Sequence, residues 1–546
     1  MKNLFLHFRS NGKKWLVAFC AALFWAAGNY AQPVTLNFMT QTQADRNHRL
    51  GAVSAFSVSY VPDQYRLYGT TSIQRTRWKS GTNVYDFWDY FFESNLPPPP
   101  PSPSPAPNRF NPLVTSDPDN CSVDKSPLDW NDRCVDAIGL FTKRVVCNPS
   151  VPNYACQNND LWNAYPGRSN MSTFPVKPAN ASAFGWPSED AWGVKNYQPI
   201  INKNTVNYQQ PNPPLSGQGG CHPHNPHELA TGTQNAKAVQ VKYPNGTARW
   251  FMAFNNQVHS EEDHGINAAD LWRVQWAYSN DGLTWTTENR PLILDQTETM
   301  SCSQGLYVVD MFIDNGYFYL IGNRVYLDHL WLMRSKIDFN STTGPGYDPN
   351  SWEVRGAYNS SAGKYNWVPI PAAMLGTHVN FTGIGAEPIL PTRFGLGHYG
   401  GALKHTIISR VFSSPNPNSP SQFVALTVDQ NQTVPASLTI LELWTTSSLD
   451  QPFVFQSNVQ NAPRGGYGYE MSFVHYPDNT AATPRVVDPV ELWISQDLSC
   501  DGRTNCCPYS VDNCPAGTSH PPLPDHFKLW TVTRRFAALA GGIYGN

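Results

Sequence analysis

The sequence predicts an all-β fold, a five-bladed β-propeller with a long Pro- and Cys-rich irregular insertion in or after the first blade. Groups of short strands with alternating apolar and polar residues recur along the chain, bounded by Asn-Gly, Pro-Asp or Pro-Asn turns. No stretch has the apolar spacing of an amphipathic helix of three turns. Repeats of about four short strands are typical of propeller blades, so five such groups indicate five blades.

Each group contains an apolar strand, a strand with Tyr or Phe after the turn, and a strand in which Trp or Leu precedes Ser. A pair of β-sandwiches is the alternative architecture for the same strands. The groups span, in order, residues 55–69 with 85–94, 238–254 with 271–285, 306–322 with 329–339, 402–412 with 421–429 and 438–453, and 469–478 with 490–498 and 526–536.

A further short strand, VTLNFM at residues 34–39, precedes the first group. In propellers, the terminal blade is often completed by a strand from the other end of the chain. We therefore expect residues 34–39 to pair with the fifth blade, which would close the ring and remove exposed sheet edges.

The composition divides the chain into four parts. Residues 97–107 read PPPPPSPSPAP, which predicts a polyproline II spacer, and irregular sequence continues to about residue 220. We expect this insertion to be held by local disulfides. The predicted parts are a signal peptide at 1–31, the first propeller strands and blade at 32–95, the insertion at 96–220 and the remaining blades at 221–546.

The N-terminal residues have the features of a cleaved export signal. Four basic residues precede the apolar run 16–27, which is too short to span a bilayer comfortably, and small residues follow it. Cleavage after Ala31 would give a secreted protein, extracellular or periplasmic, with no membrane insertion. Ten cysteines remain after cleavage, and an even number in an exported chain favours disulfides, including two within Cys500–Cys514.

Eight Asn-x-Ser/Thr sequences can accept N-linked glycans in a host that has the machinery. They begin at Asn120, Asn170, Asn180, Asn245, Asn340, Asn359, Asn380 and Asn431.

The charge balance excludes two classes of partner. Charged residues make up 14% of the chain and the net charge is −3. Loss of the four basic signal residues would lower the net charge to about −7. Nucleic acids and anionic membrane surfaces both require a basic surface, so neither is expected as the main partner.

Several segments resemble a known group of enzymes. WAYSNDGLTW (276–285) is similar to the outer-strand segment of five-bladed glycoside hydrolases of the family 43, 32 and 62 type, and to the sialidase Asp-box. VVDMFIDNGYFYLIG (308–322) resembles their inner strand with its Asp-Asn-Gly turn, and residues 443–453 and 492–498 match the outer-strand pattern more weakly. The resemblance implies an exported carbohydrate-active propeller, with a polysaccharide or glycan as its partner.

The resemblance also implies carboxylate chemistry at the central funnel. One acid protonates the leaving oxygen and a second acts as base or nucleophile. The candidates are Asp310, Glu387 in the Glu-Pro segment GIGAEP, and Glu470, each placed near the start of an inner strand. Asp310 could instead be a buried structural acid, and Asp281 and Asp314 are interpreted as turn formers.

The first group departs from the enzyme pattern. It begins GAVSAFSV, with no acid where the hydrolases place their catalytic Asp, and Asp45 is the acid just upstream. A non-catalytic propeller that binds glycans or proteins, or a subunit of an extracellular assembly, is therefore the alternative function. Tryptophans at blade turns, such as Trp331 and Trp367, could stack on sugars or wedge between sheets.

No cofactor is predicted with certainty. A structural Ca²⁺ has candidate oxygen ligands in the loop HSEEDHG (259–265) and in the acids between Asp117 and Asp132. The histidines of CHPHNPHE (221–228) could bind zinc or copper, although an exposed loop is the preferred interpretation.

Overall fold

The structure is a computed structural model of the 546-residue chain. It describes residues 34–35, 66–80, 83–95, 137–147, 163–164, 201, 229–259, 272–282, 284–288, 292–293, 295–296, 306–324, 329–375, 378–390, 405–413, 418–429, 440–460, 468–474, 486–487, 490–497 and 527–534. All regular secondary structure in these residues is β, and none of their segments is a helix that could cross a membrane. The predicted signal peptide, the acids between Asp117 and Asp132, and the 221–228 histidines lie outside the described residues.

The first and second of five larger sheets are formed by strands between residues 66 and 287. The first sheet has the order β2-β3-β4-β5 and contains β2 (Arg66–Ser80), β3 (Asn83–Asn95), β4 (Ala137–Cys147) and β5 (Asn163–Ala164). The second has the order β6-β7-β8-β9 and contains β6 (Leu229–Lys242), β7 (Ala248–His259), β8 (Trp272–Ser279) and β9 (Thr286–Thr287).

The other three larger sheets follow in chain order. The third contains β11 (Leu306–Asp314), β12 (Tyr317–Arg324), β13 (Leu330–Lys336), β14 (Glu353–Asn359) and β15 (Lys364–Pro369). The fourth contains β17 (His405–Phe412), β18 (Ser421–Asp429), β19 (Ile440–Thr446) and β20 (Val454–Gln460), with β1 (Val34–Thr35) beside β20 and β22 (Val486–Val487) beside β17. The fifth contains β21 (Gly468–Phe473), β23 (Val490–Asp497) and β24 (Phe527–Arg534). A separate small parallel pair joins β10 (Asp295–Gln296) to β16 (His378–Val379).

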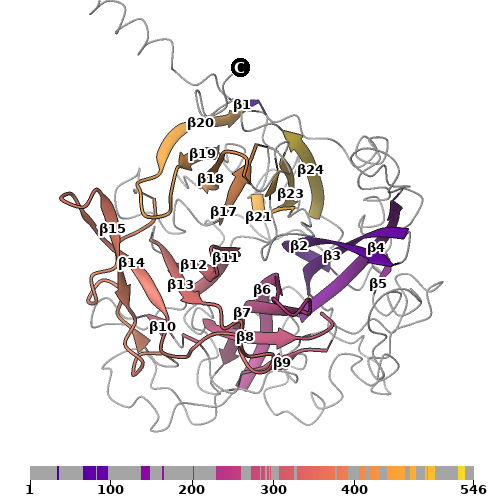
Figure 1. Ribbon diagram of the computed structural model, residues 1–546, viewed down its shortest axis with the longest axis horizontal. Coiled ribbons are helices and arrows are strands. Elements are labelled where there is room, and N and C mark those ends of the chain that lie inside the picture. Colours follow the sequence, from indigo (N-terminus) through magenta and orange to yellow (C-terminus); the bar gives the residue numbers. More distant parts are fainter. Residues whose placement is uncertain are drawn as a thin grey trace, which may run out of the picture.

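The five larger sheets surround a common centre (Figure 1). Their first strands contact one another in the closed order β2, β6, β11, β17, β21 and back to β2. We call these five the inner strands. The all-β prediction is confirmed for the described residues, and the arrangement is consistent with a β-propeller.

The strand β4 corrects the prediction that residues 96–220 are irregular. β4 pairs antiparallel with β3 along its whole length, from Ala137↔Ser94 to Cys147↔Val84. Its sequence AIGLFTKRVVC is rich in β-branched and other apolar residues, which suits a strand. The proline-rich residues 97–107 separate β3 from β4 in the sequence, but the two strands are neighbours in the same sheet.

The strand β1 corrects a second prediction. Val34 and Thr35 pair in parallel with Val459 and Gln460 of β20, at the outer edge of the fourth sheet and not in the fifth. Val34 and Thr35 do form a strand that covers a sheet edge, as predicted, and the rest of the predicted strand 34–39 lies outside the described residues.

Apolar side chains fill the spaces between the second and third sheets and between the third and fourth. Between the second and third sheets, Trp276 packs edge-on against Phe318 and Trp352, with ring centroids 5.3 and 5.9 Å apart. A second core cluster includes Phe312 and Tyr319 of the third sheet and Phe423 and Trp444 of the fourth. Burial of such rings is the main favourable term that holds one sheet against the next.

Candidate functional site

Asp310 lies on the inner strand β11, next to a β-bulge between Val308 and Asp310. Its Oδ1 accepts a hydrogen bond from the N–H of Met311 at 2.9 Å, and its Oδ2 accepts one from the N–H of Ile408 at 2.8 Å. Because the Ile408 N–H is bonded to this carboxylate, it points away from the partner strand β18 and toward the inner edge of β17. The carboxylate of Asp310 therefore lies between the inner edges of β11 and β17.

Burial sets the proton affinity of Asp310. Desolvation raises the pKa of its carboxyl to about 6, although the charge of Lys237 and the two backbone N–H groups act in the opposite direction. Lys237 belongs to the inner strand β6 and is itself only 4% exposed. Three neighbouring inner strands thus contribute to the environment of one carboxyl group.

Two buried asparagines extend this polar site. Asn255 of β7 donates through Nδ2 to the carbonyl of Leu306 at 2.7 Å and accepts at Oδ1 from the N–H of Val308 at 2.8 Å. Asn235 donates to the same Oδ1 at 3.0 Å, and its φ of 52° lies in the left-handed region that Asn tolerates better than most residues. The side chain of Asn255 therefore satisfies the inner edge of β11 as a neighbouring strand would.

Lys237, Asn235 and Asn255 are not among the site residues predicted from the sequence. A signal was present, because polar residues stand beside apolar ones within the strand segments TQNAKAVQV and FMAFNNQV. A buried polar residue requires a partner, so such polar residues in an inner strand indicate contacts between sheets.

Glu470 lies on an inner strand, as expected. Its backbone is in β21, next to a bulge between Gly468 and Glu470, and pairs with Ser495. β21 contacts β17, which in turn contacts the strand of Asp310. The side chain of Glu470 lies outside the described part of the structure.

Glu387 lies beside the outer strands of the third sheet and not on an inner strand. Its N–H donates to the carbonyl of Arg355 on β14 at 2.9 Å, and the N–H of Ile389 donates to Leu330 on β13 at 2.8 Å. The segment thus follows the outer strands, at least two strand spacings from β11, which is roughly 10 Å or more. The structure does not bring Glu387 beside Asp310.

The two predicted turn-forming acids differ in their contacts. Asp281 accepts hydrogen bonds from Ser279 Oγ at 2.9 Å and from the N–H of Thr284 at 2.7 Å, as a turn former does.

The side chain of Asp314 instead pairs across the joint between the third and fourth sheets, which corrects the prediction that Asp314 is a turn former. Arg410 of β17 donates to its two oxygens at 2.6 and 2.7 Å, and burial raises the pKa of Asp314 despite this cation. The positive φ values of Asn315 and Gly316 form the tight turn without the Asp314 side chain.

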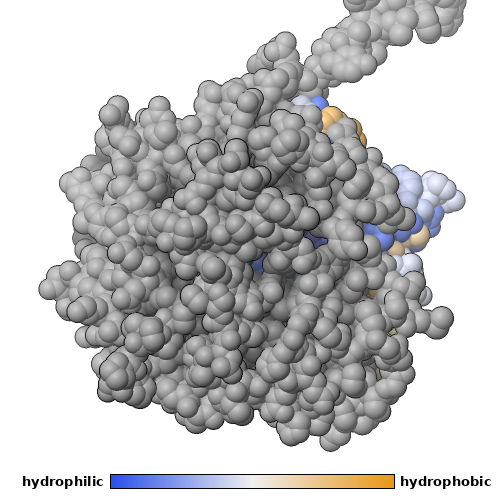
Figure 2. Space-filling model, turned by 180° about the vertical axis from the view of Figure 1, so that it is seen from behind, coloured by the Kyte–Doolittle hydropathy of each residue, from blue (hydrophilic) through white to orange (hydrophobic). Residues whose placement is uncertain are grey.

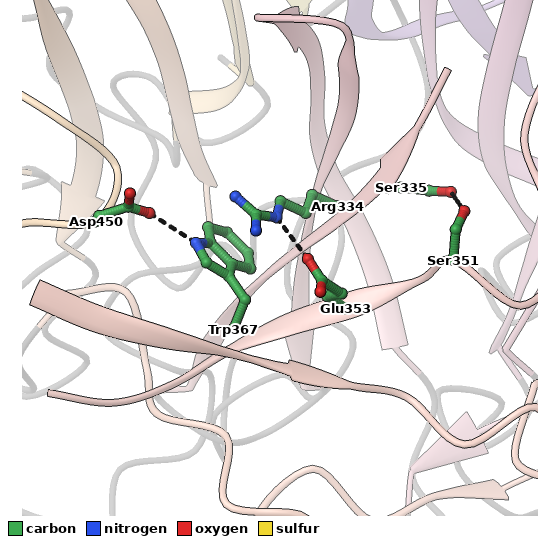
Figure 3. A network of polar contacts seen from close by, with 6 residues as sticks. All are labelled: Arg334, Ser335, Ser351, Glu353, Trp367 and Asp450. Carbon is green, nitrogen blue, oxygen red and sulfur yellow. Dashed lines mark hydrogen bonds and ion pairs between the residues drawn. The ribbon is translucent and has the colours of Figure 1, made fainter. Parts of the chain in front are cut away.

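A second polar network joins the outer strands of the third sheet to the fourth sheet (Figure 3). Arg334 bonds Glu353 at 2.8 Å, and its guanidinium lies 3.8 Å from the ring centroid of Trp367. The indole N–H of Trp367 donates to Asp450 at 2.6 Å, and the N–H of Tyr365 donates to the Asp450 carbonyl at 2.7 Å. The guanidinium of Arg334 thus covers one face of the Trp367 ring, and the indole N–H of Trp367 is bonded to Asp450. This tryptophan therefore helps to hold the third sheet against the fourth.

The described residues contain no group of three or more His, Cys, Asp or Glu side chains that could hold a metal ion. Most of the candidate calcium loop 259–265 lies outside these residues, as do all the predicted cysteine sites apart from the backbone of Cys147.

Comparison with known proteins gave structural similarities of low extent. No family model and no curated protein matches the chain. A sialidase of Trypanosoma rangeli, solved with the inhibitor DANA, is 10% identical, with a TM-score of 0.32 over 86% of this chain and 45% of its own, so this chain spans less than half of that protein. A glycoside hydrolase from the GH130 family of mannoside phosphorylases, whose hydrolases target β-1,2 mannosidic linkages in Candida mannan, is 9% identical, with a TM-score of 0.32 over 91% and 94% of the two chains. A family 117 glycoside hydrolase of the marine bacterium Zobellia galactanivorans is 10% identical, with a TM-score of 0.28 over 87% and 91%. Similarities at this level do not assign an activity to this chain.

Proposed function

We propose that this protein is an exported, five-bladed β-propeller that acts on a polysaccharide by carboxylate acid–base catalysis, in the manner of a glycoside hydrolase. The proposal rests on the position and the pKa of the Asp310 carboxyl group. Its carboxyl lies between inner strands and has a pKa of about 6, so it can both donate and accept a proton near neutral pH.

The blades in this proposal are the five larger sheets. Support comes from the inner strands, each of which contacts the next until β21 meets β2. The Pro- and Cys-rich residues on either side of β4 are then insertions within the first blade.

Glu470 is the proposed partner of Asp310. Both acids belong to inner strands, separated in the ring only by β17. One carboxyl would protonate the glycosidic oxygen while the other activates water or attacks the sugar. The positive charge of Lys237 favours ionised Asp310, so it would stabilise the carboxylate that remains once the proton has left.

One observation favours a second function, a non-catalytic propeller that binds glycans at its surface. Both oxygens of Asp310 accept backbone N–H groups, and this is how a structural acid would join β11 to β17. In that case the inner strands would carry no reactive pair of acids.

A panel of polysaccharides and aryl glycosides tests the proposal, with release and binding measured on the purified mature protein. We expect release of sugar, and we expect Glu470→Gln to lower turnover at least about 10²-fold, as is typical for loss of an acid–base group. Glu387→Gln is the matched control and should keep the activity, because Glu387 lies beside the outer strands. Binding without release would favour the second function, and full turnover in Glu470→Gln would remove Glu470 from the site.

A further inference from the structure

Four of the eight Asn-x-Ser/Thr sequences lie in described residues, and the structure separates them into two kinds. Asn245 and Asn340 are exposed and lie in connections between strands, and Asn359 is exposed at the end of β14, whereas Asn380 is partly buried. We propose that Asn245, Asn340 and Asn359 carry N-linked glycans in the exported protein and that Asn380 does not. This inference rests on the export included in the proposed function.

Asn245 lies in the tight turn between β6 and β7. Its Oδ1 accepts hydrogen bonds from the N–H and the hydroxyl of Thr247 at 3.0 and 2.7 Å. Gly246 has a φ of 84°, and the space beside its Cα is open. Because the turn itself occupies the carboxamide oxygen, the carboxamide nitrogen is the atom left for solvent and for a sugar.

Asn359 lies at the tip of the hairpin formed by β14 and β15. Its Oδ1 accepts the N–H of Ala362 at 3.0 Å, and both serines of its acceptor sequence are exposed. Figure 2 shows this hairpin as a mostly hydrophilic projection at the right-hand edge of the molecule. The neighbouring Tyr358 is 41% exposed, which is unusual for a large aromatic side chain, and the first sugar could cover its ring.

Asn340 lies in the connection between β13 and β14, close to the turn of Asn245. The rings of Tyr243 and Phe339 meet edge-on at 6.1 Å, and Arg249 donates to the carbonyl of Gly344 at 2.8 Å. Two glycans would therefore lie side by side where the second and third sheets meet.

Asn380 is unsuited to a glycan. The middle residue of its acceptor sequence, Phe381, is fully buried and stacks on Trp331 with centroids 5.3 Å apart. The Oδ1 of Asn380 accepts the N–H of Gly383 at 2.7 Å. A Cβ on Gly383 would lie 2.6 Å from the Nδ2 of Asn380, so this nitrogen is packed against the backbone. A sugar on that atom would have to displace the segment.

The transfer requires a lipid-linked oligosaccharide diphosphate as the donor. A bond forms between the Asn Nδ2 and C1 of the reducing-end sugar, and the bond from C1 to the diphosphate oxygen breaks. Nδ2 loses one proton and the lipid diphosphate leaves. The oligosaccharide is transferred while the chain is being made, before folding is complete. A chain that carries a glycan at a position the fold must bury therefore cannot reach the folded, secreted state.

The test uses the full chain secreted from eukaryotic cells, with its own N-terminal 31 residues in one arm and an unrelated cleavable signal in the other. Peptide N-glycosidase in ¹⁸O-labelled water marks each formerly glycosylated Asn as labelled Asp, which peptide mass spectrometry then locates. Thr247→Val removes the hydroxyl that the acceptor at Asn245 requires, and Thr247→Ser is the matched control that keeps it.

We expect label at Asn245, Asn340 and Asn359 and none at Asn380 in the folded, secreted fraction. Label at Asn245 should be lost in Thr247→Val and retained in Thr247→Ser. Secreted protein without label at the three exposed sites, or with equal label at Asn380, would overturn the inference. Secretion only with the unrelated signal would instead contradict the proposed export and leave the acceptor test intact.

Discussion

Opposing effects set the pKa of the Asp310 carboxyl group. Burial favours the neutral form, whereas Lys237 and two backbone N–H groups favour the ionised form, and burial has the larger effect. This balance makes the group a candidate acid–base, and it also makes the protein's stability depend on pH.

We predict that the wild-type protein loses stability relative to Asp310→Asn as the pH rises from about 4 to about 7. The folded-state pKa of about 6 lies above the ordinary value of 3.8 for an aspartate, so over this interval the folded state binds more protons than the unfolded state. The free energy of unfolding should therefore fall, by at most about 3 kcal/mol for this group. Urea unfolding of both proteins at several pH values measures the difference, and groups common to both cancel. A difference that does not change with pH would mean that the pKa is not raised.

The same substitution is a poor probe of catalysis. Asn offers one carbonyl oxygen where Asp offers two, so either Met311 or Ile408 would lose its acceptor. An unsatisfied buried N–H costs about 1–3 kcal/mol. A loss of activity in Asp310→Asn could therefore come from the loss of an acid–base group or from a less stable fold. Glu470→Gln is the better test of the proposed function.

At the scale of elements, the strands and turns that are specified by residues close together in the sequence could be predicted. The Asp-Asn-Gly turn between β11 and β12 requires two positive φ values, and Asn315 and Gly316 are suited to them. The strand β4 was missed because it lies behind a proline-rich spacer, and its partner β3 ends more than 40 residues earlier in the sequence. Long-range pairing of this kind leaves no periodic signal next to the strand itself.

The candidate site was predictable only in part, for the same reason. The acids on inner strands could be recognised because each stands out within its own apolar run. Glu387 was grouped with them because it precedes β17 in sequence, but its segment returns along β13 and β14. The contact between Asp310 and Ile408 joins residues 98 positions apart, and no local pattern specifies it.

We predict that two deletions in the segment 96–220 have opposite outcomes. Removal of residues 97–130 spares every residue of β3 and β4, so the protein should remain soluble with an unchanged β-sheet circular dichroism spectrum. Removal of 97–219 also takes away β4, so the long strand β3 keeps β2 on one side and has an unpaired edge on the other. An exposed edge of this length favours aggregation, so we expect poor solubility for the larger deletion, measured by gel filtration. A monomeric, fully β product of the larger deletion would mean that β4 is dispensable.

At the scale of the whole molecule, each larger sheet packs between two others. The ring of inner strands has no free end, because β21 contacts β2. The third sheet shares an apolar core cluster with the second sheet and another with the fourth, so loss of the third sheet would expose apolar surface on both, and we expect the sheets to unfold together.

We therefore predict a single unfolding transition in urea. Tryptophan fluorescence reports the joints between sheets, where Trp276 and Trp444 are buried, and far-ultraviolet circular dichroism reports the strands. The two midpoints should coincide. Two separate transitions would favour the alternative architecture of paired β-sandwiches, whose halves can unfold independently.

The side chain of Asn255 has a consequence for the time course of biosynthesis. It bonds the backbone of β11 at Leu306 and Val308, which are made 51 and 53 positions later in the chain. At translation rates of roughly 5–20 residues per second, its partners arrive about 3–10 s after the asparagine itself. During that interval the nascent second sheet presents a polar group and an apolar face that only the next sheet can cover. We expect a sheet that emerges from the ribosome in this state to be bound by chaperones, and we expect the joints to close in order from the N-terminus to the C-terminus.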